Sequence, residues 1–130
     1  MAIEHRIDHD RRLVVARVHG MLTDEEILAY KRELWSLPEV AGYNELVDVS
    51  DVERIALPSM ERVRQLVWLS ADRGAPRPAK LAIVAPQDVQ FGLGRMYQVY
   101  RELESQSTKR VCVFRSVEPA LAWLGLRGER

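Results

Sequence analysis

The first twenty residues contain two stretches whose pattern of apolar and polar positions is typical of strands. Residues 3–8 alternate between apolar and polar side chains, and residues 13–19 (LVVARVH) are rich in β-branched ones. A charged turn at residues 9–12 separates them. The two strands are therefore predicted to pair as an antiparallel hairpin, with the second strand ending at Gly20.

A helix is predicted directly after this hairpin. Thr23 and Glu26 have the spacing of a capping box, in which the threonine hydroxyl accepts from a first-turn amide and the glutamate reaches back. Apolar residues then recur about once per turn as far as Leu37. Pro38 is expected to stop the helix.

The rest of the chain alternates between strand and helix patterns. Strands are predicted at 45–49, 80–85 and 110–114, helices at 58–74, 88–105 and 116–125, and a loop at 50–57. Parallel strands need crossover connections, which helices provide. We therefore expect one α/β domain over residues 1–130 with the order β-β-α-β-α-β-α-β-α. Its five-stranded mixed sheet is mostly parallel, with an N-terminal antiparallel hairpin and helices on the faces.

Charge and cysteine content narrow the classes of partner. The 19 basic and 19 acidic residues cancel, so the chain has no net field to attract nucleic acid or an acidic membrane. Residues 1–66 carry 9 basic and 13 acidic side chains, and residues 67–130 carry 10 and 6. This asymmetry is too mild to imply a partner, although its direction is the one that favours head-to-tail self-association. Cys112 is the lone cysteine, which fits a reducing compartment, and no apolar run approaches the ~18 residues of a membrane span. We expect a soluble, cytoplasmic protein without stable membrane insertion.

Residues 46–53 (LVDVSDVE) read as a strand that ends in an acidic residue and a serine and leads through a loop into a helix. With residues 81–85, 91–96 (FGLGRM) and 120–124 (ALAWL), this segment resembles the SpoIIAA-like family, relatives of the STAS (anti-sigma-factor antagonist) domain. The resemblance covers nearly the whole chain. It implies a STAS-like fold and a non-catalytic interaction or regulatory module. The related Sec14-type fold implies the alternative of a small-molecule or lipid carrier.

The phosphorylation site of that family is altered in this chain. In regulatory STAS proteins a partner kinase phosphorylates a serine in an Asp-Ser-Ser-Gly stretch at the start of a helix. This sequence has Ala56-Leu57-Pro58-Ser59 at that place, so the acid and both serines are replaced. Ser59 is the remaining phosphorylation candidate, and we expect the switch to be absent.

The candidates for chemistry follow the predicted third strand. Ligands of open α/β sheets collect at the carboxyl ends of the strands, where Asp48, Ser50 and Asp51 are expected. These three side chains can bind a polar ligand or Mg²⁺, or they can form part of an enzyme site. Alternatively, they accept hydrogen bonds from backbone amides of the loop. A triad of Ser50, His19 and Asp48 lacks the Gly-x-Ser-x-Gly elbow. The three histidines lack metal-ligand spacing, so we expect no metal and no cofactor, and we favour a protein without catalysis.

The predicted helix at 88–105 has more apolar surface than one helix face can bury. Gly92 and Gly94 lack the third glycine of a dinucleotide fingerprint, and we expect them to serve close packing. The surplus predicts a homo-oligomer, most simply a dimer, or contact with another regulatory protein. Alternatively, the helix covers a cavity for a small apolar ligand, or these side chains are packed in the core. The interface candidates are Phe91, Met96, Tyr97 and Tyr100.

Overall fold

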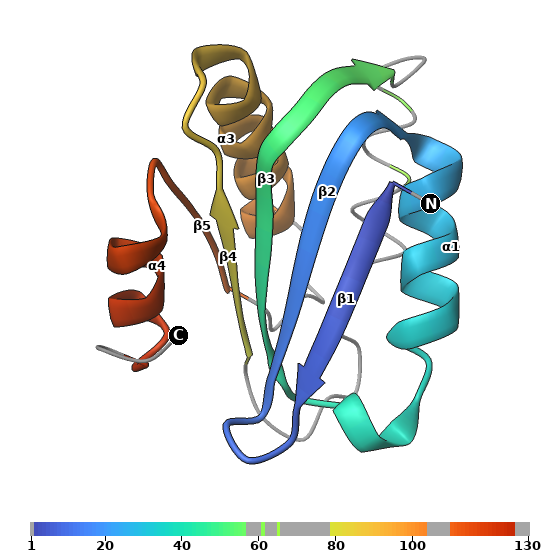
Figure 1. Ribbon diagram of the computed structural model, residues 1–130, viewed down its shortest axis with the longest axis vertical. Helices are drawn as coiled ribbons and strands as arrows, with labels where there is room; N and C mark the ends of the chain where they lie inside the picture. Colours follow the sequence, from blue (N-terminus) through green and yellow to red (C-terminus); the bar gives the residue numbers. More distant parts are fainter. Residues whose placement is uncertain (1, 57–60, 62–64, 66–78, 104–109, 127–130) are drawn as a thin grey trace.

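The five predicted strands form one sheet in the order β1-β2-β3-β4-β5 (Figure 1). A computed structural model of the chain describes residues 2–56, 61, 65, 79–103 and 110–126. β1 pairs antiparallel with β2, and β2, β3, β4 and β5 run parallel, as predicted. The strands are β1 (Ile3–Asp8), β2 (Leu13–Thr23), β3 (Asn44–Ala56), β4 (Lys80–Val84) and β5 (Arg110–Phe114).

Three helices are described between and after these strands: α1 (Asp24–Leu34), α3 (Asp88–Leu103) and α4 (Val117–Trp123). A short 3-10 helix (Pro38–Val40) follows α1. The Thr23 hydroxyl accepts a hydrogen bond from the backbone N–H of Glu26 at 3.2 Å, which confirms the predicted cap of α1. The helix predicted at 58–74 falls outside the described residues except for Glu61 and Gln65, which are both helical.

The helices cover opposite faces of the sheet, and Figure 1 shows α1 and α4 on opposite sides of the strands. On one face, Leu13 and Leu46 pack with Ala120 of α4. On the other, called the α1/α3 face below, Val14 packs with Leu34 of α1, and the side chain of Val113 packs in a cluster with Phe91 of α3. The pairing register places Val14, Ala16, Glu45, Val47, Leu81, Ile83, Val111 and Val113 on this second face.

Two predicted strand ends are wrong, because β2 and β3 are both longer than the sequence suggested. Gly20 was expected to end β2, but the strand continues to Thr23. The backbone of Gly20 has a φ of +72° and lies at a shift in the pairing register, so the glycine forms a bulge inside the strand. The loop expected at 50–57 is strand as far as Ala56, because the prolonged β2 supplies hydrogen-bond partners.

The prolonged strands form a ribbon, called the β2–β3 extension below, made of residues 20–23 and 52–56. β4 pairs with β3 only from Glu45 to Asp48, so no other described strand flanks β3 in this ribbon. The side-chain amide of Gln90 in α3 donates to the backbone oxygen of Val52 at 2.8 Å, in a buried contact. Gln90 therefore ties the extension to α3.

The two glycines of α3 test the predicted close packing. A Cβ atom at Gly94 would lie 3.1 Å from Cγ1 of the buried Val113, whereas one at Gly92 would meet nothing within 4 Å.

Gly92→Ala should raise the free energy of unfolding by about 0.5–1 kcal/mol, because alanine is the better helix former. Gly94→Ala should be less stable than Gly92→Ala by about 1 kcal/mol or more, because Val113 must move. Chemical denaturation of both variants measures the difference, and equal stabilities would show that α3 does not pack closely on β5.

Candidate functional site

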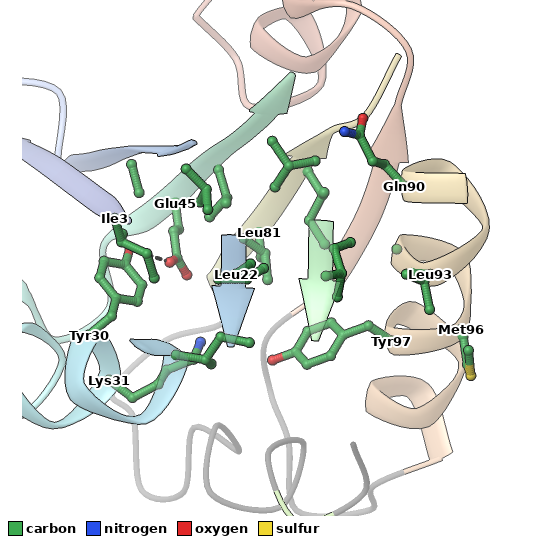
Figure 2. Close-up of a pocket in the computed structure, with 18 residues that line it drawn as sticks. Ile3, Leu22, Tyr30, Lys31, Glu45, Leu81, Gln90, Leu93, Met96 and Tyr97 are labelled. Carbon is green, nitrogen blue, oxygen red and sulfur yellow. Dashed lines mark hydrogen bonds between the residues drawn. The ribbon is translucent and has the colours of Figure 1, made fainter. Parts of the chain in front are cut away.

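A pocket of about 170 Å³ lies on the α1/α3 face of the sheet (Figure 2). Its floor comes from alternate residues of the central strands, and its walls come from α1, α3 and the β2–β3 extension. Most of the lining is apolar, as in typical small-molecule sites. The apolar lining residues are Ile3, Ala16, Val18, Leu22, Ile27, Val47, Val49, Ile55, Leu81, Ile83, Leu93, Gly94 and Met96.

The polar part of the pocket contains a fully buried carboxyl group. Glu45 is 0% exposed and stands in register between Val14 of β2 and Leu81 of β4. The Tyr30 hydroxyl of α1 donates to Oε2 of Glu45 at 2.5 Å. Lys31, the next residue of α1, lines the same side of the pocket in Figure 2. A carboxyl group buried among apolar side chains is costly unless it is hydrogen-bonded, and Tyr30 provides part of that compensation.

The phenol of Tyr30 stays protonated because of its surroundings. Burial and, after it, the neighbouring Glu45 carboxylate raise the pKa of Tyr30 far above its ordinary value. The hydrogen bond to Glu45 acts in the same direction, because it requires the phenol proton. Tyr30 therefore acts as a hydrogen-bond donor, and not as a base, throughout the physiological range.

The opposite wall of the pocket comes from α3. Leu93, Met96 and Tyr97 line it, as Figure 2 shows, and Gln90 lies at the start of the helix. Gln90 is 5% exposed, and its Oε1 atom has no hydrogen-bond partner among the described residues, while its Nε2 atom donates to the backbone oxygen of Val52. Both walls contribute polar groups: α1 supplies a hydroxyl and an ammonium group beside the carboxyl, and α3 supplies the Gln90 amide and the Tyr97 hydroxyl among apolar side chains.

The predicted cluster of Asp48, Ser50 and Asp51 lies in the middle of β3 and not in a loop after a strand. None of the three lines the pocket. Oδ1 of Asp48 accepts from both the backbone N–H and the hydroxyl of Ser50, and Asp51 forms an ion pair with Arg17 at 2.6 Å. The bond from the Ser50 amide to Asp48 matches the alternative in which the carboxylates satisfy backbone amides, whereas Asp51 pairs with a guanidinium instead. Ligand binding at the cluster stays a prediction.

The remaining predicted residues are dispersed. Met96 and Tyr97 line the pocket, and Phe91 packs against the core under the guanidinium of Arg115, 4.1 Å from the ring centre. Ser59 and the side chain of Tyr100 fall outside the described part of the chain. A role for these residues in an interface or in phosphorylation stays a prediction.

The structure does not bring the histidine and cysteine candidates into one site, because His19 lies on β2 and Cys112 lies on β5. Nε2 of His19 lies 3.1 Å from Oε2 of Glu4, in an exposed pair, and His19 lies opposite Asp51 in the register. Cys112 is half-buried in β5. Within the described residues, no group of three or more His, Cys, Asp or Glu side chains is arranged to hold a metal ion.

Glu45 and Tyr30, the buried polar pair of the pocket, were not among the residues predicted from the sequence. A signal was present for Glu45, which is in phase with Val47 and Val49 and so occupies an apolar position of its strand. Tyr30 looked like an ordinary apolar position of α1. The described helices include none that is both long enough and apolar enough to cross a membrane.

The buried phenol predicts a stability change at alkaline pH. Above about pH 10 the unfolded chain loses the Tyr30 proton and the folded chain keeps it, so the folded state binds more protons and the free energy of unfolding falls. This group should contribute a slope of up to about 1.4 kcal/mol per pH unit, which Tyr30→Phe removes. Urea denaturation of both proteins from pH 8 to 11 measures the slopes, and identical slopes would contradict the assignment.

Comparison with known proteins shows which fold the chain has. No protein-family model and no curated protein matches the sequence. Among solved structures, an uncharacterized protein of the DUF3478 family from Shewanella loihica PV-4, described as having a SpoIIAA-like fold, superposes with a TM-score of 0.61. The match covers 95% of this chain and 93% of that one, at 18% sequence identity. Together with the mixed five-stranded sheet and its helices, this likeness shows that the chain has a SpoIIAA-like fold, as its resemblance to that family implied.

Proposed function

We propose that this protein is a non-catalytic binding module of the STAS-like type whose ligand is a small, mainly apolar molecule held in the pocket on the α1/α3 face. The observation that supports this most directly is the pocket itself. Its volume of 170 Å³ is several times that of one buried water, and most of its lining is apolar. Between the two carrier ligands that the fold suggests, this volume favours a small molecule over an entire lipid.

A non-catalytic role fits the chemistry of the described residues. Catalytic sites bring together a nucleophile or base, a group that orients it and a reaction cleft. In this protein Asp48 and Ser50 bond each other, Asp51 pairs with Arg17, and none of them lines the pocket. An enzyme that uses these three residues is therefore supported less well than binding.

Binding can be tested with toluene, a small apolar probe. Toluene should shift the NMR signals of pocket methyl groups in a saturable way. Leu93→Trp places a large side chain on the pocket wall and should abolish this response. Val89→Trp is the matched control in the same helix, because Val89 is 74% exposed and does not line the pocket. A wild-type protein that shows no saturable shift, or a response that survives Leu93→Trp, would contradict the proposal.

Self-association is a second candidate function, supported by exposed apolar residues on α3. Val89 and Val99 are 74% and 48% exposed, and helical spacing places them on one stripe with Gly92 and Met96. Burial of such a stripe against a second copy would remove apolar surface from water. The dimer predicted from the surplus apolar surface of this helix would then use the outer surface of α3. Met96 and Tyr97, two of the predicted interface residues, also line the pocket.

Sedimentation velocity over a concentration series tests this second function. The wild type should move from monomer towards dimer between low and high micromolar concentration. Val99→Glu should shift that transition at least about tenfold upward, because a charge would be buried at the interface. Met21→Glu, at a residue 51% exposed on β2, should leave it unchanged. A wild-type protein that is still monomeric at high micromolar concentration would rule out self-association through α3.

A further inference from the structure

The polar side chains of the pocket differ in whether they are open to a ligand. Tyr30 donates to Glu45, and both residues have a further interaction within the protein, as does Tyr97. The side-chain amide of Gln90 donates to a backbone oxygen, and its own oxygen is buried. The remaining polar residue of the described lining is Lys31. Lys31 is therefore the polar side chain of this lining that is open to a ligand.

The ammonium group of Lys31 has donors to offer. Lys31 is half-buried in the last turn of α1, and Figure 2 shows it on the same side of the pocket as Tyr30 and Glu45. Its Nζ atom lies 5.9 Å from the centre of the Tyr30 ring. An ammonium group has three N–H donors, and within the described part of the chain Lys31 uses none of them in a hydrogen bond or ion pair. The apolar stem of such a side chain can line the pocket while its donors reach a ligand.

A donor beside an apolar wall selects a ligand that carries an acceptor. A ligand without one would displace water from the Lys31 ammonium and give no bond in return, which is costly. An oxygen acceptor replaces the lost water. Hydrogen bonds from a charged donor are stronger than those between neutral groups, and apolar surroundings strengthen them further.

The charges on this side of the pocket favour a neutral acceptor. The fully buried Glu45 carboxylate already stands on the same side as the Lys31 ammonium (Figure 2). The two charges offset each other. An anionic ligand would bring a second negative charge to one cation, in apolar surroundings that disfavour an uncompensated charge. A carbonyl or ether oxygen accepts from Lys31 without adding a charge.

The volume of the pocket sets the size of the ligand. An engineered protein cavity of about 150 Å³ holds benzene. A pocket of 170 Å³ therefore has room for one six-membered ring with a small substituent. Leu93 and Met96 of α3 supply apolar surface for the ring on the side away from Lys31, as Figure 2 shows.

We infer that the pocket selects a neutral molecule with one six-membered ring and one oxygen acceptor. The acceptor binds the Lys31 ammonium, and the ring lies against α3. The inference rests on the proposed function and adds the class of ligand to it.

Three probes of nearly the same shape separate the possible classes. α-Methylstyrene has no acceptor, acetophenone has a neutral carbonyl oxygen in place of its methylene group, and benzoate has an anionic carboxylate. NMR titration of each probe at neutral pH gives the three dissociation constants. The wild type should bind acetophenone more tightly than benzoate, because Glu45 disfavours the anion. The affinity ratio of acetophenone to α-methylstyrene then measures the contribution of the acceptor, and it can be compared between variants.

Lys31→Met removes the donor and keeps a long side chain that is a good helix former, so the variant should fold. It should lower the ratio of acetophenone to α-methylstyrene affinity at least about tenfold, which corresponds to about 1.4 kcal/mol. Lys31→Arg keeps a charged donor and should retain most of the preference. Arg32→Met is the matched control, because Arg32 is the next cation of α1, is exposed and does not line the pocket. It should keep the wild-type ratio.

The outcomes distinguish this inference from the proposed function. A ratio that Lys31→Met leaves unchanged, or that Arg32→Met lowers equally, would overturn the inference, while saturable binding of toluene would leave the binding function intact. Benzoate that binds as tightly as acetophenone, or more tightly, would overturn the neutral class of ligand. Failure of all three probes and of toluene to bind would overturn both proposals.

Discussion

The parallel pairing of β2 with β3 is the constraint on which the rest of the structure depends. It joins the antiparallel β1–β2 hairpin to the parallel strands, and a parallel pair needs a crossover, which α1 supplies. Its register also decides which side chains share a face. Because Val14 lies opposite Glu45, the carboxyl group points to the α1/α3 face, and a shift of one residue would send it towards α4. The pocket and its polar part therefore follow from this single register.

The pocket and its carboxyl group both reduce stability. Atoms that line a void lose dispersion contacts with the missing neighbours, and a buried carboxyl group loses its hydration. The hydrogen bond from Tyr30 recovers only part of that loss. A sequence chosen for stability alone would fill the space and replace Glu45 by an aliphatic residue. These two costs occur at one place in a core otherwise built of hydrophobic clusters, which is why we propose a binding role for this part of the fold.

Most of the fold was predictable from the sequence, because its local signals agree with its tertiary structure. The strand at 110–114 was predicted with its observed ends, and the cap at Thr23 needed only local spacing. The extension of β3 was missed because Asp51, Glu53 and Arg54 look like loop residues, although they belong to a strand whose partner is supplied by β2. The pocket was missed for a related reason. Tyr30 and Glu45 are 15 residues apart on different elements, and only the crossover brings them together.

The β2–β3 extension leaves one edge of β3 without a neighbouring described strand. Such an edge is a template on which another chain can add a strand, and proteins oppose this with charged side chains along it. Asp51, Glu53 and Arg54 are exposed along this stretch, and Gln90 occupies the carbonyl oxygen of Val52. A second copy that added its own strand here would have to displace that bond and strip water from the charges. The same charged residues that made this strand look like a loop in the sequence are of the kind that opposes the growth of a sheet into a polymer.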